Sequence, residues 1–369
     1  MIFAFVVAAF AATLFADSEK SANAIIRLLN SRAAGSQRAY EEAARVVRED
    51  AEKGRALQRF LLAILSRDVN APDAARLSER QREEYLASRE KIRKLAETNG
   101  NPLALYLLSM ESGDIGLLER AASGGNVQAL NALGTLRLTE VESDAAISPA
   151  VAEEARSKAY GCFKRASDQG DVNGLYNLGV CHMNGYGCSR DGKKAFDCFR
   201  VAAEAGHADA ITNLGGFFRD GVLVRKDLRL SVAWFHKSAE MRNEYGILNY
   251  AQALLSGEGV KQDHVGAAKL LRYLSEDRKH PEGMCMYGMC LLRGVGVGKD
   301  EVAAFEWFRK SAEAGLPMAM NNLSDCYESG SGVGVDHVKA LEWKMRARAA
   351  SGDRAAAEWV RNSLKTEAK

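Results

Sequence analysis

The sequence is poor in proline and carries no excess of charge of either sign. Only five prolines occur among 369 residues, and long stretches without proline favour helices, because proline removes a backbone donor and clashes inside a helix. The 50 basic and 48 acidic residues leave a net charge of +2, and they alternate along the chain. Proteins that bind a phosphate backbone usually carry a basic stripe, so we predict no nucleic-acid partner.

Motifs typical of catalysis or metal binding are also scarce. The six histidines are scattered and include no His-Glu-x-x-His run. Residues 293–300, RGVGVGKD, superficially resemble a phosphate loop, but the glycine spacing is wrong and the segment ends in Asp. Cys181, His182 and Cys188 are close in sequence, yet their number and spacing fit zinc sites poorly. We therefore predict no enzyme activity, no cofactor and no metal.

One long apolar run does occur, at the N-terminus. Residues 1–16, MIFAFVVAAFAATLFA, contain a single polar residue, Thr13, and charge begins at Asp17. The run is shorter than the roughly 20 residues that span a bilayer, and it suits a secretory signal cleaved after Ala16. It lacks a preceding Lys or Arg, so an uncleaved anchor, a misplaced start and a buried helix stay open as alternatives. The favoured interpretation is an exported protein, periplasmic or secreted.

Between Val127 and Gly352 the chain repeats one pattern, and after a longer first repeat the period is 36 or 37 residues. A small residue is followed four positions later by Leu or Tyr, and then usually by Gly. These pairs are Leu133-Gly134, Leu178-Gly179, Leu214-Gly215, Tyr250-Ala251, Tyr287-Gly288 and Leu323-Ser324. A glycine loop, an Asp and a second helical segment follow. Such a period is typical of stacked helical hairpins, which together bury a core that one hairpin alone cannot.

The recurring residues suggest structural roles. The small residue should let two helices approach, and a residue of the second helix should fill the other side of that contact. In the six repeats the latter is Cys162, Cys198, Trp234, Leu270, Trp307 and Trp343. Loop glycines are expected to adopt positive φ where the first helix ends. They are Gly185, Gly221, Gly257, Gly294 and Gly330. An Asp should then cap the second helix. These are Asp191, Asp227, Asp263, Asp300 and Asp336.

The pattern small-x-x-x-Leu-Gly, Gly-x-Gly-Val-x-x-Asp and Ala-x-x-Trp-Phe-x-x-Ala resembles the Sel-1-like repeat (SLR) family, a subgroup of the tetratricopeptide-like (TPR-like) helical repeats. Six repeats cover residues 126–352, and the first replaces the glycine loop with a segment about nine residues longer, either a contact loop or a tolerated insertion. The resemblance implies an all-α fold, an α/α solenoid of stacked helix–loop–helix repeats in a right-handed superhelix. It also implies a non-enzymatic scaffold or adaptor that binds a protein or peptide along its concave face.

The regions flanking the repeats give the domain organisation. Residues 1–16 are the signal or anchor, and 17–125 form an N-terminal helical region with degenerate repeats. There, 101–125 is a shortened hairpin, 39–54 resembles a second helix, and 56–66 and 78–99 form a further helix pair. Residues 353–369 are a C-terminal capping helix, over 353–365, and a tail.

The seven cysteines mostly fall in apolar positions. Cys181, Cys290 and Cys326 occupy the same position of their repeats and are expected to act as small apolar residues. A cysteine-rich branch of the family has a disulfide in each repeat. This chain lacks that regular pairing, so the β-lactamase-like envelope hydrolase activity claimed for that branch is kept only as the alternative function. In an exported protein a single bridge such as Cys181–Cys188 stays open, and the odd count leaves at least one thiol free.

A column of amides is the candidate partner-binding site. Its members lie two residues before the Gly position of the first helix, and Met286 interrupts them. They are Asn177, Asn213, Asn249 and Asn322. The resemblance places first helices on the concave side, where an amide can donate to and accept from the backbone of an extended peptide. The alternative interpretation is that these amides bond to neighbouring helices and hold the stack together.

Overall fold

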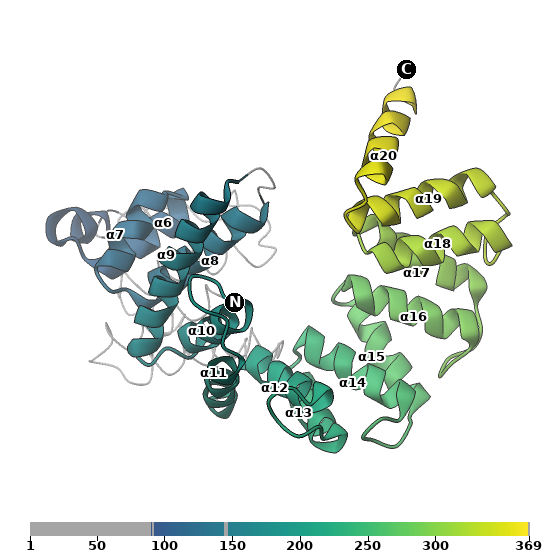
Figure 1. Ribbon diagram of the computed structural model, residues 1–369, viewed down its shortest axis with the longest axis horizontal. Helices are drawn as coiled ribbons and strands as arrows, with labels where there is room; N and C mark the ends of the chain where they lie inside the picture. Colours follow the sequence, from purple (N-terminus) through teal and green to yellow (C-terminus); the bar gives the residue numbers. More distant parts are fainter. Residues whose placement is uncertain (1–89, 91, 144–146, 368–369) are drawn as a thin grey trace, which may run out of the picture. The chain divides into compact units, whose positions relative to one another are not determined.

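The computed structural model describes residues 90, 92–143 and 147–367, and all its regular elements there are helices (Figure 1). The predicted signal or anchor at 1–16 and the predicted helices at 39–54 and 56–66 lie outside the described residues. Of the predicted helix at 78–99, the structure describes a helix over 92–99. Among the described helices, none combines the length and the apolar character needed to cross a membrane.

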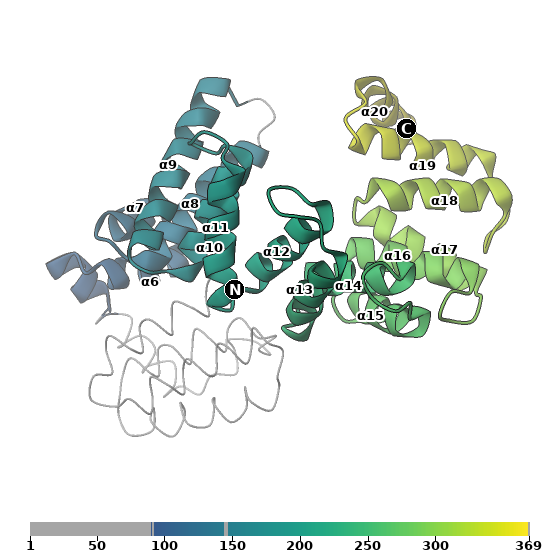
Figure 2. The same ribbon diagram turned by 60° about the horizontal axis from the view of Figure 1, so that its bottom comes forward.

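Two compact units divide the chain, the first ending at His207 and the second beginning at Ala208. In the first unit each helix packs on the next one in sequence (Figure 2). After the helix over 92–99 its helices are α6 (Pro102–Ser112), α7 (Ile115–Ser123), α8 (Val127–Ser143), α9 (Pro149–Asp168), α10 (Val172–Asn184) and α11 (Gly192–Glu204). The pair α6–α7 is the predicted shortened hairpin, with a left-handed Gly113 as its turn.

In the second unit, too, each helix packs on its successor, and α12 also contacts α14 while α16 contacts α18. The helices are α12 (Ala208–Asp220), α13 (Leu228–Glu240), α14 (Glu244–Ser256), α15 (His264–Glu276), α16 (Pro281–Arg293), α17 (Glu301–Glu313), α18 (Pro317–Ser329), α19 (His337–Ala350) and α20 (Arg354–Glu367). Repeats three to six are therefore stacked hairpins, which confirms the all-α solenoid. The predicted capping helix is α20, whose first turn is capped by Asp353.

A glycine–phenylalanine contact joins the two helices of most hairpins. A Cβ atom placed on Gly134 would lie 2.6 Å from Cε1 of Phe163, and one on Gly288 would lie 2.8 Å from Cε1 of Phe308. Both phenylalanines are almost completely buried. The prediction that the preceding residue, such as Cys162 or Trp307, fills this contact is wrong. Those side chains are only half-buried, because neighbouring residues on a helix point about 100° apart.

A different small residue joins successive repeats. A Cβ on Gly174 of α10 would lie 2.6 Å from the Cβ of Ala166 in α9, and one on Gly283 of α16 would lie 2.6 Å from the Cβ of Leu274 in α15. In these repeats, and at Gly246 of α14 against Ser238 of α13, the first small residue thus packs on the second helix of the preceding repeat. The stack therefore has two close contacts per repeat, one within the hairpin and one between hairpins.

The glycine loops and the Asp caps are as predicted. All five loop glycines have φ between 69° and 78°, and each of the five aspartates accepts a backbone N–H bond at the start of its second helix. The second glycine of a loop lies close to the backbone of another repeat. A Cβ on Gly332 would overlap the backbone of Glu301, in the first turn of α17. Each such loop therefore packs against the preceding repeat.

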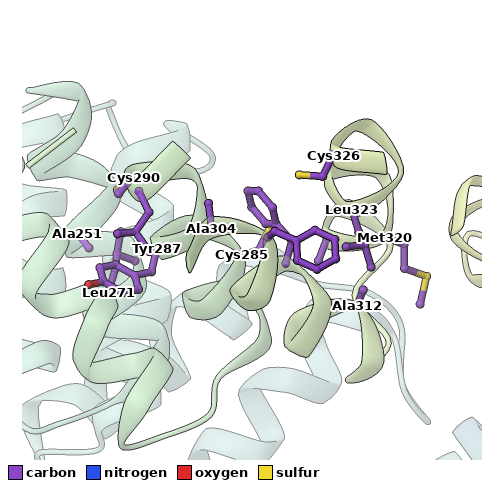
Figure 3. Close-up of a cluster of buried hydrophobic side chains, with 14 of the residues drawn as sticks. Ala251, Leu271, Cys285, Tyr287, Cys290, Ala304, Ala312, Met320, Leu323 and Cys326 are labelled. Carbon is purple, nitrogen blue, oxygen red and sulfur yellow. The ribbon is translucent and has the colours of Figure 1, made fainter. Parts of the chain in front are cut away.

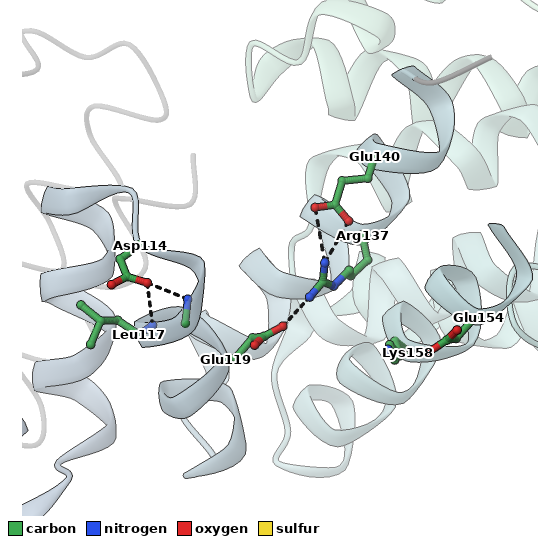
Figure 4. Close-up of polar contacts among 8 residues, drawn as sticks. Asp114, Leu117, Glu119, Arg137, Glu140, Glu154 and Lys158 are labelled. Carbon is green, nitrogen blue, oxygen red and sulfur yellow. Dashed lines mark hydrogen bonds and ion pairs between the residues drawn. The ribbon is translucent and has the colours of Figure 1, made fainter. Parts of the chain in front are cut away.

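Repeat one departs from this pattern in an unexpected way. Its helices have 17 and 20 residues, against 13 in the hairpin α10–α11. The extra residues mainly lengthen both helices, so the predicted insertion is not simply a loop. Residues 144–146, between the two helices, are not among the described residues. Ser148, instead of an Asp, caps α9. Ion pairs link this repeat to the hairpin before it, since Arg137 of α8 pairs with Glu119 of α7 and also with Glu140 of its own helix (Figure 4).

The cysteines of the second unit belong to the core. Cys285, Cys290 and Cys326 lie in one buried cluster that runs from α14 to α19, together with residues such as Leu271 and Leu323 (Figure 3). All seven cysteines of the chain are free thiols in the structure. Their role as small apolar residues is confirmed for this buried set.

Candidate partner-binding surface

Each first helix of the second unit carries one stripe of side chains that is not buried. Residues spaced by four, three and four positions lie on one face of a helix, and at those positions no side chain is buried. We name this set the first-helix stripe. It consists of Asp209, Asn213, Gly216 and Asp220 on α12; Tyr245, Asn249, Gln252 and Ser256 on α14; Glu282, Met286, Met289 and Arg293 on α16; and Met318, Asn322, Asp325 and Ser329 on α18.

Three of the four predicted site residues lie on this stripe, and two of these bond to a neighbouring helix. Asn249 accepts a hydrogen bond of 2.9 Å from Nη1 of Arg219 on α12 and donates one of 2.7 Å to the carbonyl of Tyr245. Asn322 donates to Sγ of Cys285 on α16 at 3.3 Å. These two amides therefore help to hold first helices together, as the alternative interpretation of the column predicted.

The other two amides behave differently. Asn213 on α12 and Asn177 on α10 are half-buried, and within the described residues neither side chain forms a hydrogen bond. Asn177 belongs to the first compact unit and Asn213 to the second. The predicted column is thus a set of unlike members, and of the column amides that lie on the stripe Asn213 is the one whose donors and acceptor are all available to a ligand.

The stripe combines three kinds of chemistry. Amides on α12 and α14 are followed by the thioethers of Met286 and Met289 on α16, which lie at the edge of the buried cluster. Flexible thioethers adapt to differently shaped apolar groups. Charges also lie along the stripe, and the hydrogen bond from Arg219 lowers the pKa of Asp220. Such a surface can bind a chain segment through backbone hydrogen bonds and apolar contacts together.

A further set of contacts, which the sequence analysis missed, links two first helices, α12 and α8, to the start of the next repeat. Thr212 bonds to Ser238 at 2.7 Å and to the capping Asn243 at 3.1 Å. In the first unit, Asn131 donates to the capping Asp171 at 2.7 Å. Both Thr212 and Asn131 stand three residues before the Gly position. This shared position is the signal that would have revealed them, and their role is to hold the stack.

One cysteine and one histidine lie side by side at the end of α10 and in the loop that follows it. Sγ of Cys188 lies 3.5 Å from Nδ1 of His182. Burial raises the pKa of the Cys188 thiol and lowers that of His182, so both shifts favour the neutral pair over a thiolate. Burial also raises the pKa of Cys181 to about 12. No group of three metal-ligating side chains occurs among the described residues.

Comparisons with known proteins agree with this architecture. The family model described as Sel1 repeat matches about half of the chain, at residues 154–171, 172–207, 208–243, 245–276, 281–316 and 317–343. A similar solved structure is c5321, a protective antigen present in uropathogenic Escherichia coli strains that displays an SLR fold. It is 25% identical with a TM-score of 0.53, and the match covers 86% of this chain but only 66% of c5321.

A second similar structure is a Sel1 repeat protein from Oxalobacter formigenes. It is 23% identical with a TM-score of 0.54, and the match covers 71% of this chain and 99% of that protein. No curated protein matches the sequence. The solved structures therefore support the fold, whereas any partner has to be inferred from the surface of this chain.

Proposed function

This chain belongs to the Sel1 repeat family, and on that premise we propose that it is a non-enzymatic scaffold whose first-helix stripe binds an extended segment of a protein partner. The repeat fold is of a kind suited to protein–protein interaction. The observation that carries the proposal is the half-buried Asn213 amide, which bonds to no described residue although Asn249, at the same position of the next repeat, bonds to Arg219. We take the stripe as the concave face expected from the sequence.

The contacts around the stripe favour an extended peptide over a small molecule. The stripe recurs on four successive first helices, so its amides and thioethers are presented at intervals along the stack rather than converging on one point. An extended chain offers backbone donors and acceptors at regular intervals, which suits such an array. Met286 and Met289 would then contact an apolar side chain of the segment.

Site-specific photo-crosslinking in cells tests where the partner binds. A photoreactive residue in place of Gln252, an exposed member of the stripe on α14, should crosslink a partner that mass spectrometry then identifies. The matched control replaces Lys269 on α15, which is also exposed but lies on a second helix. Equal crosslinking of the same partner from both positions would contradict the proposal.

A substitution then tests the amide itself. Asn213→Ala removes one donor and one acceptor without removing a described hydrogen bond, so the melting temperature should stay unchanged. Loss of one hydrogen bond of about 1 kcal/mol should weaken binding of the identified partner about fivefold. Asn322→Ala is the contrast, because Asn322 bonds to Cys285 and its loss should also lower the melting temperature. A lowered melting temperature for Asn213→Ala would assign that residue to the stack instead.

We also propose that the protein acts in the cell envelope. The support is the apolar run at residues 1–16 and the abrupt onset of charge at Asp17. N-terminal sequencing of the mature protein, combined with cell fractionation, tests this. A mature chain that begins at Asp17 in the exported fraction is expected, and an intact N-terminus in the cytoplasmic fraction would refute it.

A further inference from the structure

The charged residues of the second unit are divided between its two sets of helices. The first helices α12, α14, α16 and α18 carry only two basic residues, Arg219 and Arg293. Their six acidic residues are Asp209, Asp220, Glu244, Glu282, Asp325 and Glu328. On the second helices α13, α15, α17 and α19, ten basic residues outnumber six acidic ones. Charge that alternates along the chain thus leaves the first helices with a net negative charge.

Tyr245 is an exposed aromatic residue on these first helices. It belongs to the first-helix stripe of α14, and 58% of it is exposed. Its ring meets the ring of His280 in a T-shaped contact, with centroids 5.5 Å apart and planes at 87°. Such a contact brings the edge of one ring to a face of the other. His280 therefore leaves at least one face of the Tyr245 ring uncovered.

Two carboxylates lie close to Tyr245, on the first helices before and after α14. Asp209 of α12 accepts a hydrogen bond of 2.6 Å from Asn243, which caps α14 two positions before Tyr245. Glu282 of α16 lies 3.3 Å from Nδ1 of His280, the residue whose ring contacts Tyr245. Asp209, Tyr245 and Glu282 are each the second residue of their helix. We name these three residues the Tyr245 site.

The tryptophans of the second helices differ from Tyr245 in one respect. A cation of the same helix lies over each ring, and the distances to the centroids are 5.3 Å at Trp234, 4.2 Å at Trp307 and 4.8 Å at Trp343. Among the described residues no cation lies over the Tyr245 ring. Arg278, which is close to it, pairs instead with Glu244 at 2.6 Å. Tyr245 thus combines an exposed ring with neighbouring negative charge and has no cation of its own.

We propose that the Tyr245 site binds the cationic group of an arginine or lysine of the partner segment, an inference that rests on the proposed function. A cation over an aromatic face is attracted by the quadrupole of the ring, and the carboxylates of Asp209 and Glu282 supply opposite charge. Each helix start carries a partial positive charge of about half a unit, which each carboxylate more than offsets on its own helix. Because Met286 and Met289 also lie on the stripe, the segment should combine a basic residue with an apolar one.

Selection from a random peptide library displayed on phage, with the full chain as bait, tests the proposal. The peptides that bind on the stripe are those that crosslink to a photoreactive residue in place of Gln252. Most of them should contain an arginine or lysine together with an apolar residue. If peptides crosslink there without any excess of basic residues, this inference is wrong and the proposed function stands. If no peptide crosslinks there, both are wrong.

Fluorescence anisotropy with one selected peptide then assigns the contact. Replacing its basic residue by glutamine should weaken binding to the native chain about tenfold, but binding to Tyr245→Ala by less than about twofold. Tyr245→Phe keeps the ring and should keep the tenfold difference, and exchanging arginine for lysine in the peptide shows which of the two the site prefers. The matched control is Val302→Ala, since Val302 is the second residue of α17 and is 63% exposed; it should bind like the native chain. An equal loss for the native chain and Tyr245→Ala would overturn the proposal.

Discussion

The neighbouring hairpins α8–α9 and α10–α11 share the same contact between their two helices but differ in helix length and in how the helices are connected. In both, a glycine of the first helix packs against a buried phenylalanine of the second, Gly134 on Phe163 and Gly179 on Phe199. The hairpin α10–α11 has helices of 13 residues, a glycine loop and an Asp cap. The hairpin α8–α9 has longer helices and a Ser cap.

The comparison separates two kinds of glycine. The glycine inside a first helix is required in both hairpins, because a side chain there would collide with the phenylalanine ring. The loop glycines are required only where the first helix must stop and the chain must pack on the preceding repeat. Helix length can therefore vary between repeats while the helix–helix contact stays the same, which explains how repeat one tolerates its extra residues.

The largest expected effect tests whether the shared contact is equally important in both hairpins. Phe163→Ala and Phe199→Ala each remove a ring that is 1% exposed, so each should lower the free energy of unfolding by about 3–5 kcal/mol. Urea denaturation followed by circular dichroism measures this. If the cost in α9 were less than half of that in α11, the longer helices of repeat one would carry its stability instead.

A smaller effect is expected from filling the glycine positions. A Cβ at Gly134 would lie 2.6 Å from the ring of Phe163, and one at Gly179 would lie 2.8 Å from the ring of Phe199. Overpacking should cost about 1–3 kcal/mol, and the higher helix propensity of alanine offsets up to about 1 kcal/mol of it. Gly134→Ala and Gly179→Ala should thus lower the urea midpoint.

The matched control for these variants is Gly161→Ala in α9. A Cβ at Gly161 meets nothing within 4 Å, so this variant should raise the free energy of unfolding by about 0.5–1 kcal/mol. A result in which all three variants stabilise the protein would show that the rings move aside at little cost, and the close contact would then be incidental.

The smallest effect concerns acid. The pKa of Asp191 is lowered, first by the backbone N–H of Lys194 and then by the Lys194 side chain, whereas Ser148, the cap of α9, does not titrate. A lowered folded-state pKa stabilises the native state above the unfolded value, near 3.9, and this stabilisation is lost as pH falls through the folded value. Asp191→Asn should keep a cap but reduce the loss of melting temperature between pH 5 and pH 2, measured by calorimetry. If the variant lost as much melting temperature on acidification as the parent protein, the Asp191 carboxylate would not contribute to acid sensitivity.

The sequence predicted those features that depend on a few neighbouring residues. A glycine at positive φ such as Gly185, and an Asp that bonds three residues ahead such as Asp191, leave a local signature. The buried side of the second helix was harder to predict. The sequence analysis placed Cys162 in the contact with the first helix, whereas the structure places the next residue, Phe163, there. Local patterns fix where helices lie but not which side of a helix meets its partner.

The candidate site was only partly predictable for a related reason. The spacing of the amides was visible in the sequence, but their environments depend on residues far along the chain. Asn249 meets Arg219, 30 residues earlier, and Asn322 meets Cys285, 37 residues earlier. Nothing local distinguishes these two from Asn213, which has no such neighbour among the described residues. Equivalent positions therefore carry different roles.

The second loop glycines have a consequence for how the second unit responds to mechanical load. Gly296 fits against the backbone of His264 at the start of α15, and Gly332 fits against that of Glu301 at the start of α17, so each of these loops packs on the second helix of the preceding repeat. Force applied at the C-terminal end must unseat one such joint before the next is loaded. Each rupture frees one repeat of 36 residues, or about 120–130 Å of extended chain. Pulled from this end, the second unit would lengthen in equal steps, each corresponding to the unfolding of one repeat.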